Sequence, residues 1–456
     1  INTANKMFAS IRVNFKSFRV RDLNESLRFL SSSGTLYADH KCRVLVVGGG
    51  SGGCSMASKI CSYLRQDDVI VLEPSDVHYY QPMFTMIGGG MKTLDQSRRP
   101  MSSVLPKKAR WLKDSAQTFK PNENVVLTSS GDKIAYEYLV VAVGLKLDYD
   151  KIPGLTKALS IPNGNVCSNY SPQYVERTFA ALKRFQEGVA LFTFPESPIK
   201  CPGAPQKILY IAEHYLRKSG KRSKAQLKYH TTLGVLFGVK HYADALWEIV
   251  RKRGIDVTLR SNLVEVRPET NEAVFRNLDT GEETIIKYSM LHATPPMSPP
   301  EALSSCKELV NATGYLDVDK DTLRHIKYNN VFGIGDCMSS PNSKTAASVA
   351  GQSAIVYSNL KSVMNGKDES SRMKKYDGYA SCPLVTGYNS CILAEFDYTM
   401  KPLETFPFRQ DKERRSMFYM KKDLMPALYW DGLLRGYWNG PAMMRKMMGL
   451  VKFGQQ

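Results

Sequence analysis

The sequence predicts an α/β fold with two Rossmann-like dinucleotide-binding domains, followed by short helices at the C-terminus. Two stretches of the chain indicate this. In residues 42–65 an apolar strand runs into a glycine-rich turn and a helix, and residues 224–254 repeat the order of strand, turn and helix. The 456 residues suffice for two or three packed units, and 43% of them are hydrophobic, which is ordinary for a globular protein.

The first glycine-rich turn has the spacing of a dinucleotide-binding turn. Residues 44–47 form a continuous apolar run, as expected for a buried parallel strand, and the pattern G-x-G-x-x-G follows at once. The first glycine allows the tight turn, the second lets the backbone approach a pyrophosphate, and the third lets the helix pack close to the strand. The residues expected to cradle the pyrophosphate are Gly48, Gly50, Ser51, Gly52 and Gly53.

An acidic residue follows at the distance that a bound ribose requires. The next predicted strand, residues 68–74, contains Glu73, about 20–25 residues after the turn, where the acid that binds the ribose hydroxyls is expected. The glycine pattern alone is weak evidence, and the alternative is a glycine turn that binds nothing. The strand before it, the helix after it and the acid beyond it favour the dinucleotide.

Two later patterns add a family resemblance. Residues 136–149 form a strand that runs into Gly144, and residues 330–340 form a strand that ends in G-I-G-D. Together with the first turn they resemble the disulfide reductase superfamily of flavoproteins, which have two dinucleotide-binding domains. The resemblance implies FAD as the cofactor, a first domain made of two separate segments, and Asp336 at the ribityl chain of the flavin. Spacing alone does not separate FAD from NAD.

The second strand–turn–helix unit lacks a complete glycine fingerprint. Its turn, residues 231–238, contains only two glycines, and bulky side chains stand beside them at Leu233, Leu236 and Phe237. Such side chains block the close approach of a pyrophosphate to the backbone. The sequence therefore predicts a second Rossmann-like domain without a working pyridine-nucleotide site, and an enzyme that takes its electrons from another donor.

Two of the nine cysteines share an unusual context. Cys201 and Cys382 are each followed by proline, and Lys200 beside Cys201 favours the thiolate, which is the nucleophilic form. The alternative is that each is a small buried apolar residue. The cysteines show no C-x-x-C pair and no metal-ligand spacing, so no metal site is predicted, and this sparse usage is typical of an intracellular protein.

Several motifs in combination resemble the sulfide:quinone oxidoreductases of the mitochondrial type. They are KCPGAPQK (200–207), SCPLVTGYN (381–389), QPMFTMIGGG (81–90), ATPPMSPP (293–300), FGIGDC (332–337) and SKTAAS (343–348). The resemblance implies that hydrogen sulfide attacks a disulfide or trisulfide between Cys201 and Cys382. It places Cys201 beside the flavin and Cys382 as the persulfide carrier. Ubiquinone would take the electrons, and glutathione, sulfite or cyanide would take the sulfur.

The same resemblance supplies the remaining cofactor contacts. The matching positions are Gln81, the backbone around Ala116, Gly144, Asp336 and Lys344. Lys344 is expected near the isoalloxazine carbonyls, where a cation stabilises the reduced flavin. Bacterial relatives can use a third cysteine, and Cys167 is the only candidate for it, so FAD is expected to bind without a covalent bond.

The N-terminal residues resemble a mitochondrial transit peptide, which is rich in arginine and serine and poor in acids. Its basic residues are Lys6, Arg12, Lys16, Arg19 and Arg21. The alternative is a disordered basic arm. The expected parts of the chain are a transit peptide (1–40), an FAD-binding domain (41–165 and 300–365), a degenerate NAD-type domain (166–299) and a C-terminal region with the second redox cysteine and the membrane contact (366–456).

The C-terminal stretch, residues 417–453, combines aromatic, leucine, methionine and basic residues, and Pro426, Gly436 and Pro441 are expected to break it into short helices. Such amphipathic helices suit a membrane surface, and the alternative is a helical pair packed on the core. The net charge of +19 points to an anionic partner. Because no nucleic-acid motif is present, we expect peripheral binding to the inner mitochondrial membrane on the matrix side.

Two other functions remain open from the sequence. A type II NADH:quinone dehydrogenase also uses FAD, quinone and a membrane-surface tail, but it requires an intact second glycine fingerprint and no paired cysteines. A non-catalytic, redox-sensing or nucleic-acid-binding flavoprotein would account for the positive charge. Tight, salt-sensitive binding to DNA and inertness towards sulfide would favour this second alternative.

Overall fold

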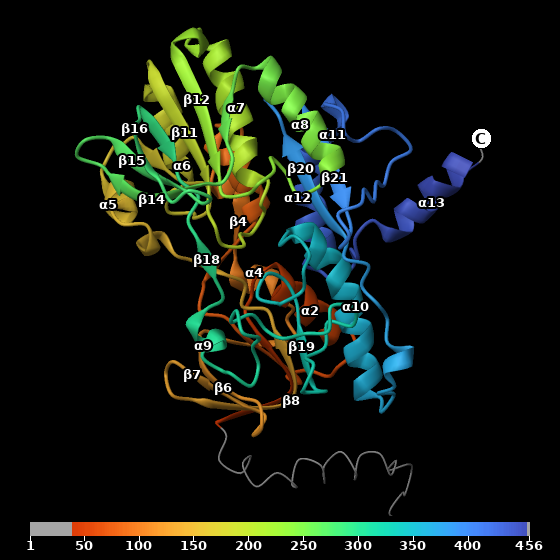
Figure 1. The fold of residues 1–456 in the computed structure, drawn as a ribbon. Helices are drawn as coiled ribbons and strands as arrows, with labels where there is room; N and C mark the ends of the chain where they lie inside the picture. Colours follow the sequence, from red (N-terminus) through yellow and green to blue (C-terminus); the bar gives the residue numbers. More distant parts are fainter. Residues whose placement is uncertain (1–38, 454–456) are drawn as a thin grey trace, which may run out of the picture.

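The computed structural model describes residues 39–453 and has the predicted α/β architecture, with two sheets of mainly parallel strands stacked end to end (Figure 1). The predicted transit peptide falls almost wholly on residues 1–38, outside the described residues. A third part, made of a two-stranded hairpin and the C-terminal helices, lies beside the junction of the two sheets (Figure 1).

The first sheet is made from two separate segments of the chain. Its seven strands are β1 (His40–Val47), β2 (Val69–Leu72), β5 (Arg110–Leu112), β6 (Ala116–Lys120), β7 (Val125–Thr128), β8 (Lys133–Val141) and β19 (Val331–Gly333). The order is β5-β2-β1-β8-β7-β6, and β19 pairs in parallel with β8. Since β19 comes far later in the chain than its neighbours, a second domain interrupts the first. The numerical domain limits stay predictions.

Two helices cover one face of this sheet and begin at its carboxyl edge. The glycine-rich turn leads from β1 into α2 (Ser51–Cys61), and the segment after β19 leads into α10 (Ala346–Met364). The hydroxyl of Thr345 caps α10 by accepting a hydrogen bond from Ser348 N. Ligands of doubly wound sheets bind outside this edge, so the fold directs both helix N-termini to one site.

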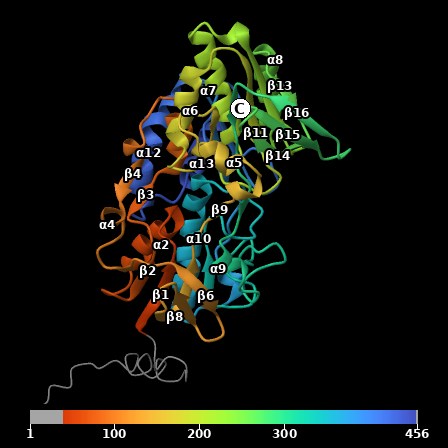
Figure 2. The same cartoon turned by 90° about the vertical axis from the view of Figure 1, so that its left-hand side faces the viewer.

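The second sheet is wholly parallel and carries its own helices (Figure 2). Its strands, in spatial order, are β10 (Val166–Cys167), β17 (Met290–His292), β11 (Gly188–Phe194), β12 (Ala225–Thr231) and β13 (Asp256–Thr258). Its main helices are α6 (Val175–Arg184), α7 (Ala204–Lys218) and α8 (Lys240–Lys252). An antiparallel sheet of β14 (Ser261–Arg267), β15 (Glu272–Asn277) and β16 (Glu283–Lys287) precedes β17.

The sequence analysis looked for the nucleotide-binding turn of this domain after residues 224–232. The strand order shows that this turn is a different one. In a doubly wound sheet the nucleotide binds after the strand at which the order reverses, which is β11 here. Residues 224–254 form the second strand–turn–helix unit of this sheet, because their strand β12 lies beside β11 and not at the reversal of the order. The turn after β11, residues 195–203, contains Cys201 and no glycine fingerprint. The prediction of a degenerate site therefore rests on that turn.

The third part begins with the hairpin of β20 (Ala380–Val385) and β21 (Cys391–Phe396). A continuous helical run follows, made of α11 (Arg415–Tyr419), the π-helix η7 (Met420–Leu424), α12 (Met425–Ala427) and the π-helix η8 (Leu428–Leu433), and α13 (Ala442–Phe453) is a separate helix after it. Pro426 was expected to break this run into short helices, but the run continues through it. It lies between two π-helical segments, where the missing N–H of proline is tolerated, and Gly436 and Gly440, both with positive φ, end the run.

Part of the C-terminal stretch packs on the core, which corrects the expectation that its aromatic residues face a membrane. Phe418, Tyr429 and Trp430 are buried. The rings of Tyr429 and Trp430 contact Tyr80, with centroid separations of 4.5 and 6.3 Å. This packing removes their large apolar surface from water.

Lys59 fastens this segment to α2. Its Nζ atom, buried with the rest of the side chain, donates to Gly436 O at 2.7 Å and to Asn439 Oδ1 at 2.5 Å. Lys59→Met leaves both acceptors unpaired, so we expect a loss of about 1–3 kcal/mol in the free energy of unfolding and faster amide hydrogen exchange around residue 436. The exposed Lys107→Met is the matched control, and equal exchange in both variants would contradict this role.

Candidate active site

The three parts of the fold enclose one large cavity of about 680 Å³, a size typical of cofactor sites. Ten of the residues singled out from the sequence line it: Gly48, Gly50, Ser51, Gly52, Glu73, Gln81, Gly144, Cys201, Asp336 and Lys344. Three others do not line it. Gly53 and Cys382 lie directly behind its wall, and Ala116 lies on β6.

The glycine turn is closely packed at Gly53 and open to the cavity at Gly50. Gly48 has φ +102°, and a Cβ placed on Gly53 would lie 1.7 Å from Gly48 O. A Cβ on Gly50 would meet nothing within 4 Å. Gly53 therefore permits the packing of α2 on β1, whereas Gly50 leaves backbone accessible from the cavity. This is the division of roles that a pyrophosphate-binding turn requires.

Glu73 follows β2 directly and lines the cavity beside the glycine turn. Its carboxylate accepts hydrogen bonds from Gly49 N at 2.6 Å and from Ser75 N at 2.8 Å. These bonds fix an acidic group directly beside the glycine turn. The position suits a carboxylate that receives ribose hydroxyls.

A hydrogen-bonded chain that sequence reasoning missed ties the C-terminal segment to this turn. His78 Nδ1 donates to Gly49 O at 3.0 Å, since a carbonyl can only accept. His78 Nε2 therefore accepts from the Tyr429 hydroxyl at 2.7 Å, and that hydroxyl lies 2.8 Å from Ser51 Oγ. Burial lowers the pKa of His78 to about 4, so the ring stays neutral.

Three charged residues also line the cavity: Lys200, Asp336 and Lys344. Burial raises the pKa of Asp336 above its ordinary value, against the lowering effect of the cations of Lys344 and Lys200. Burial also lowers the pKa of Lys200 to about 8. Lys344 Nζ donates to Met338 O at 3.0 Å. The residues present thus fit a dinucleotide: the glycine turn would hold its pyrophosphate, Asp336 its ribityl chain, and Lys344 and Cys201 would lie near its redox-active ring.

The loop that carries Cys201 is held against the first domain. Cys201 N donates to Lys344 O at 2.7 Å, and Cys201 O accepts from Ala204 N at 2.8 Å. The residue has φ +50°, a left-handed conformation that is uncommon for a side-chain-bearing residue and concentrates at functional sites. These bonds fix the thiol at the cavity wall, at the start of α7.

The structure brings Cys201 and Cys382 together across 181 positions of sequence as a pair of free thiols in hydrogen-bond contact. The bond from Cys382 holds the pKa of Cys201 well below its ordinary value, with help from the charges of Lys207 and Lys421, against the effect of burial. The pKa of Cys382 is raised by the same bond and by burial. Cys201 is therefore the thiolate of the pair.

Lys207 supplies the direct contact to this thiolate, with its Nζ 3.2 Å from Cys201 Sγ. The sequence had pointed to Lys200, the adjacent residue. Lys207 lies in the first turns of α7, where a side chain points back towards the helix N-terminus, so the helix start was the pattern that could have found it. Lys421 comes from η7, and no local pattern links it to either cysteine.

The remaining cysteines stay outside this contact. Cys167, the candidate for a third redox cysteine, is buried on β10, where its thiol contacts Leu291 O at 3.5 Å. Cys391 is buried at the start of β21, and the charges of Lys207 and Lys421 act on it only against a dominant effect of burial, which raises its pKa to about 12.

Known proteins resemble this chain over most of its length. A family model described as pyridine nucleotide-disulphide oxidoreductase matches residues 42–176. The mitochondrial sulfide:quinone oxidoreductase of Mus musculus is 52% identical over 414 residues, which cover 91% of each chain. That of Dictyostelium discoideum is 43% identical over 400 residues, 87% of each chain.

The chain belongs to the sulfide:quinone oxidoreductase family. Membership confirms the predicted resemblance and makes the protein a flavin-dependent oxidoreductase, and it does not favour the two alternative functions. The solved sulfide:quinone oxidoreductase of the bacterium Aquifex aeolicus shares the fold, with a TM-score of 0.74 at 20% identity over 90% of this chain and 96% of that one. Among the described residues of this family member, no helix has the length and apolar character to cross a membrane.

Proposed function

We propose that this sulfide:quinone oxidoreductase oxidises hydrogen sulfide at Cys201 and Cys382 and passes two electrons through non-covalently bound FAD to ubiquinone. The observation that carries the proposal is the cation-stabilised Cys201 thiolate, which touches Cys382 and lines the same cavity as the glycine turn. When bound, FAD supplies a two-electron acceptor that can be reoxidised by a quinone.

The two cysteines have unequal environments, which assigns their roles. Hydrosulfide attacks Cys382 Sγ of a Cys201–Cys382 disulfide, the S–S bond breaks, and Cys201 leaves as a thiolate while Cys382 keeps the new sulfur as a persulfide. A leaving thiol of low pKa departs faster, and the pKa of Cys201 is the lowered one. With a trisulfide at rest, attack at Cys382 Sγ breaks the bond of Cys382 to the bridging sulfur, so Cys201 leaves as a persulfide anion and Cys382 again keeps the new sulfur.

The sulfur and the electrons then leave by separate routes. A small nucleophile, glutathione, sulfite or cyanide, takes the outer sulfur of the Cys382 persulfide. The two thiols re-form their S–S bond, and the two electrons released pass to the flavin. The charges of Lys207 and Lys421 act on Cys201 and compensate the negative charge that appears on sulfur.

The cavity lining includes a set of apolar side chains, here called the apolar lobe, that suits a lipid quinone. The set comes from the hairpin, from the loop that follows it and from the C-terminal region, and it consists of Pro383, Leu393, Phe406, Met417, Met420, Leu424, Met425, Leu428, Trp438 and Met444. Methionine and leucine side chains adapt to an isoprenoid chain. This supports ubiquinone as the acceptor of electrons.

The same helices carry the features of a membrane contact. Exposed large apolar residues gather there: Tyr419, Leu424, Tyr437, Met443 and Met447, with exposed fractions of 54, 52, 82, 76 and 61%. Basic residues alternate with them along the chain, and the net charge is +19. We therefore place the protein on the matrix face of the inner mitochondrial membrane as a peripheral protein, where the lobe can receive quinone from the bilayer.

Steady-state assays with the purified protein test this function. We expect sulfide to reduce a short-chain ubiquinone only while glutathione or sulfite is present to take the sulfur, and we expect NADH to give no reduction. Quinone reduction with NADH, and none with sulfide, would overturn the proposal.

A further inference from the structure

The C-terminal segment, residues 429–440, packs against the two helices that begin at the cofactor cavity. Ser58 Oγ of α2 donates to Leu434 O at 2.6 Å, and a Cβ placed on Gly440 would lie 3.3 Å from a backbone nitrogen of α10. We propose that this segment, through the hydroxyl of Tyr429, holds the glycine-rich turn in the conformation that binds FAD. The inference deepens the proposed function and rests on it for FAD as the cofactor.

The hydrogen bonds of Tyr429 reach both neighbours of Gly50, the residue at which the turn is open to the cavity. On one side, His78 Nδ1 donates to Gly49 O at 3.0 Å. On the other side, the Tyr429 hydroxyl lies 2.8 Å from Ser51 Oγ. The bond of 2.7 Å between the Tyr429 hydroxyl and His78 Nε2 joins the two contacts. Side chains from outside the turn therefore fix residues 49 and 51 and leave the backbone between them accessible.

These contacts allow one arrangement of protons. Gly49 O can only accept, so Nδ1 of the neutral His78 ring carries the proton and Nε2 accepts from the Tyr429 hydroxyl. The Tyr429 proton is committed to His78, so Ser51 donates its hydroxyl proton to Tyr429. Ser51 therefore offers a pyrophosphate its backbone N–H, which begins α2, and not its hydroxyl proton.

Such fixation matters because the turn consists mainly of glycine. Residues 48–53 read GGGSGG, and glycine gives an unbound backbone more conformational freedom than any other residue. A ligand that must order a flexible loop loses affinity, whereas a loop already held in the bound conformation costs it less. Since Tyr429 and His78 hold two residues of this turn, we expect them to preorganise it for FAD.

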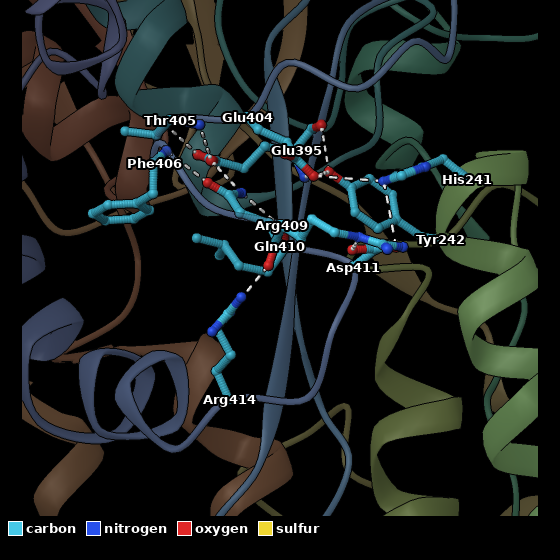
Figure 3. Close-up of polar contacts among 11 residues, drawn as sticks. His241, Tyr242, Glu395, Glu404, Thr405, Phe406, Arg409, Gln410, Asp411 and Arg414 are labelled. Atoms are coloured by element: carbon cyan, nitrogen blue, oxygen red, sulfur yellow. Dashed lines mark hydrogen bonds and ion pairs between the residues drawn. The ribbon is translucent and has the colours of Figure 1, made fainter. Parts of the chain in front are cut away.

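The chain ahead of the C-terminal helices has a separate anchor. Figure 3 shows the Glu395 carboxylate of β21 surrounded by residues of the segment 404–410. This carboxylate accepts from Thr405 N at 2.8 Å and from Gln410 Nε2 at 2.8 Å. Because this network and the contact with α2 remain when the Tyr429 hydroxyl is removed, we expect Tyr429→Phe to loosen the turn without detaching the segment.

The rate at which FAD leaves the oxidised holoenzyme after dilution, followed by the rise of flavin fluorescence, tests the inference. We expect Tyr429→Phe, which keeps the ring and loses the hydroxyl, to release FAD about three- to thirtyfold faster, the value of one or two neutral hydrogen bonds. Tyr210→Phe is the matched control. It removes a buried hydroxyl that donates to Gln206 Oε1 at 3.0 Å in the second domain, and Tyr210 does not line the cavity, so FAD should leave at the original rate.

A double variant tests whether Tyr429 acts through the turn. Ser51→Ala removes the other end of the hydrogen bond. The increase in the release rate of the double variant Ser51→Ala, Tyr429→Phe should therefore be smaller than the product of the increases of the two single variants.

Three outcomes would overturn the inference. They are an unchanged release rate in Tyr429→Phe, an equal increase in Tyr429→Phe and Tyr210→Phe, and a double variant that shows the full product of the single increases. The last two would assign Tyr429 a merely structural role. All these rates are measured without sulfide, so they decide the inference separately from the sulfide and NADH assays that decide the proposed function.

Discussion

Cys201→Ser is expected to abolish sulfide-dependent quinone reduction, with a fall on the order of a thousandfold or more. A serine hydroxyl neither forms a disulfide with Cys382 nor ionises at neutral pH. The variant also loses the leaving group that Lys207 stabilises at 3.2 Å. The rate of decylubiquinone reduction at saturating sulfide, measured on protein of equal flavin content, checks this expectation.

Flavin content separates lost chemistry from a lost cofactor. Cys201 contacts the first domain through its backbone, which serine retains, so Cys201→Ser should bind FAD normally. Cys391→Ser is the matched control. Cys391 is also buried and feels the charges of Lys207 and Lys421, but it has no part in the proposed disulfide. Full sulfide activity in Cys201→Ser, or equal losses in both variants, would refute the thiol mechanism.

Lys207→Met is expected to slow sulfide oxidation about ten- to hundredfold at pH 7 and to make the enzyme dependent on alkaline pH. The charge and hydrogen bond of Lys207 help to keep the pKa of Cys201 low, so the thiolate persists at neutral pH. Without them the pKa rises towards its ordinary value, and the thiolate forms only as the pH rises. The ratio of variant to original activity should therefore increase from pH 7 to pH 9.

Lys207→Arg keeps the positive charge and serves as the control. It should lose less activity than Lys207→Met and should keep the pH profile of the original protein. A constant deficit of Lys207→Met at every pH would mean that the lysine acts through packing, because it is buried, and not through the pKa of Cys201.

The sequence was sufficient where local patterns determine structure. The turn after β1 requires glycine at 48 and 53, because the backbone there has positive φ or no room for a Cβ, so the motif predicted both the turn and the site. The family resemblance carried by the G-I-G-D pattern implied a first domain of two segments, and the pairing of β19 with β8 has this form. Ten predicted residues line one cavity, and Gln81, Gly144, Asp336 and Lys344 among them were implied by the family resemblance.

The sequence was insufficient where the contact depends on packing between distant segments. Lys421 reaches the cysteines, and Tyr429 reaches His78 and Ser51, only because the C-terminal helices fold back onto the first domain. The aromatic residues of these helices were expected on a membrane, since helical spacing does not distinguish a core from a lipid surface. The nucleotide-binding turn of the second domain was assigned to the wrong strand–turn–helix unit, because the order of strands in a sheet depends on which strands pair and cannot be predicted from one strand alone.

The most direct test of the central claim is the visible spectrum of the purified, FAD-containing protein after anaerobic addition of sulfide together with glutathione, which takes the sulfur. Our account predicts that the flavin band bleaches, that a long-wavelength charge-transfer band marks the Cys201 thiolate beside the flavin, and that a short-chain quinone restores the original colour. A spectrum that sulfide leaves unchanged, but that NADH bleaches, would contradict the account and would favour an NADH:quinone dehydrogenase.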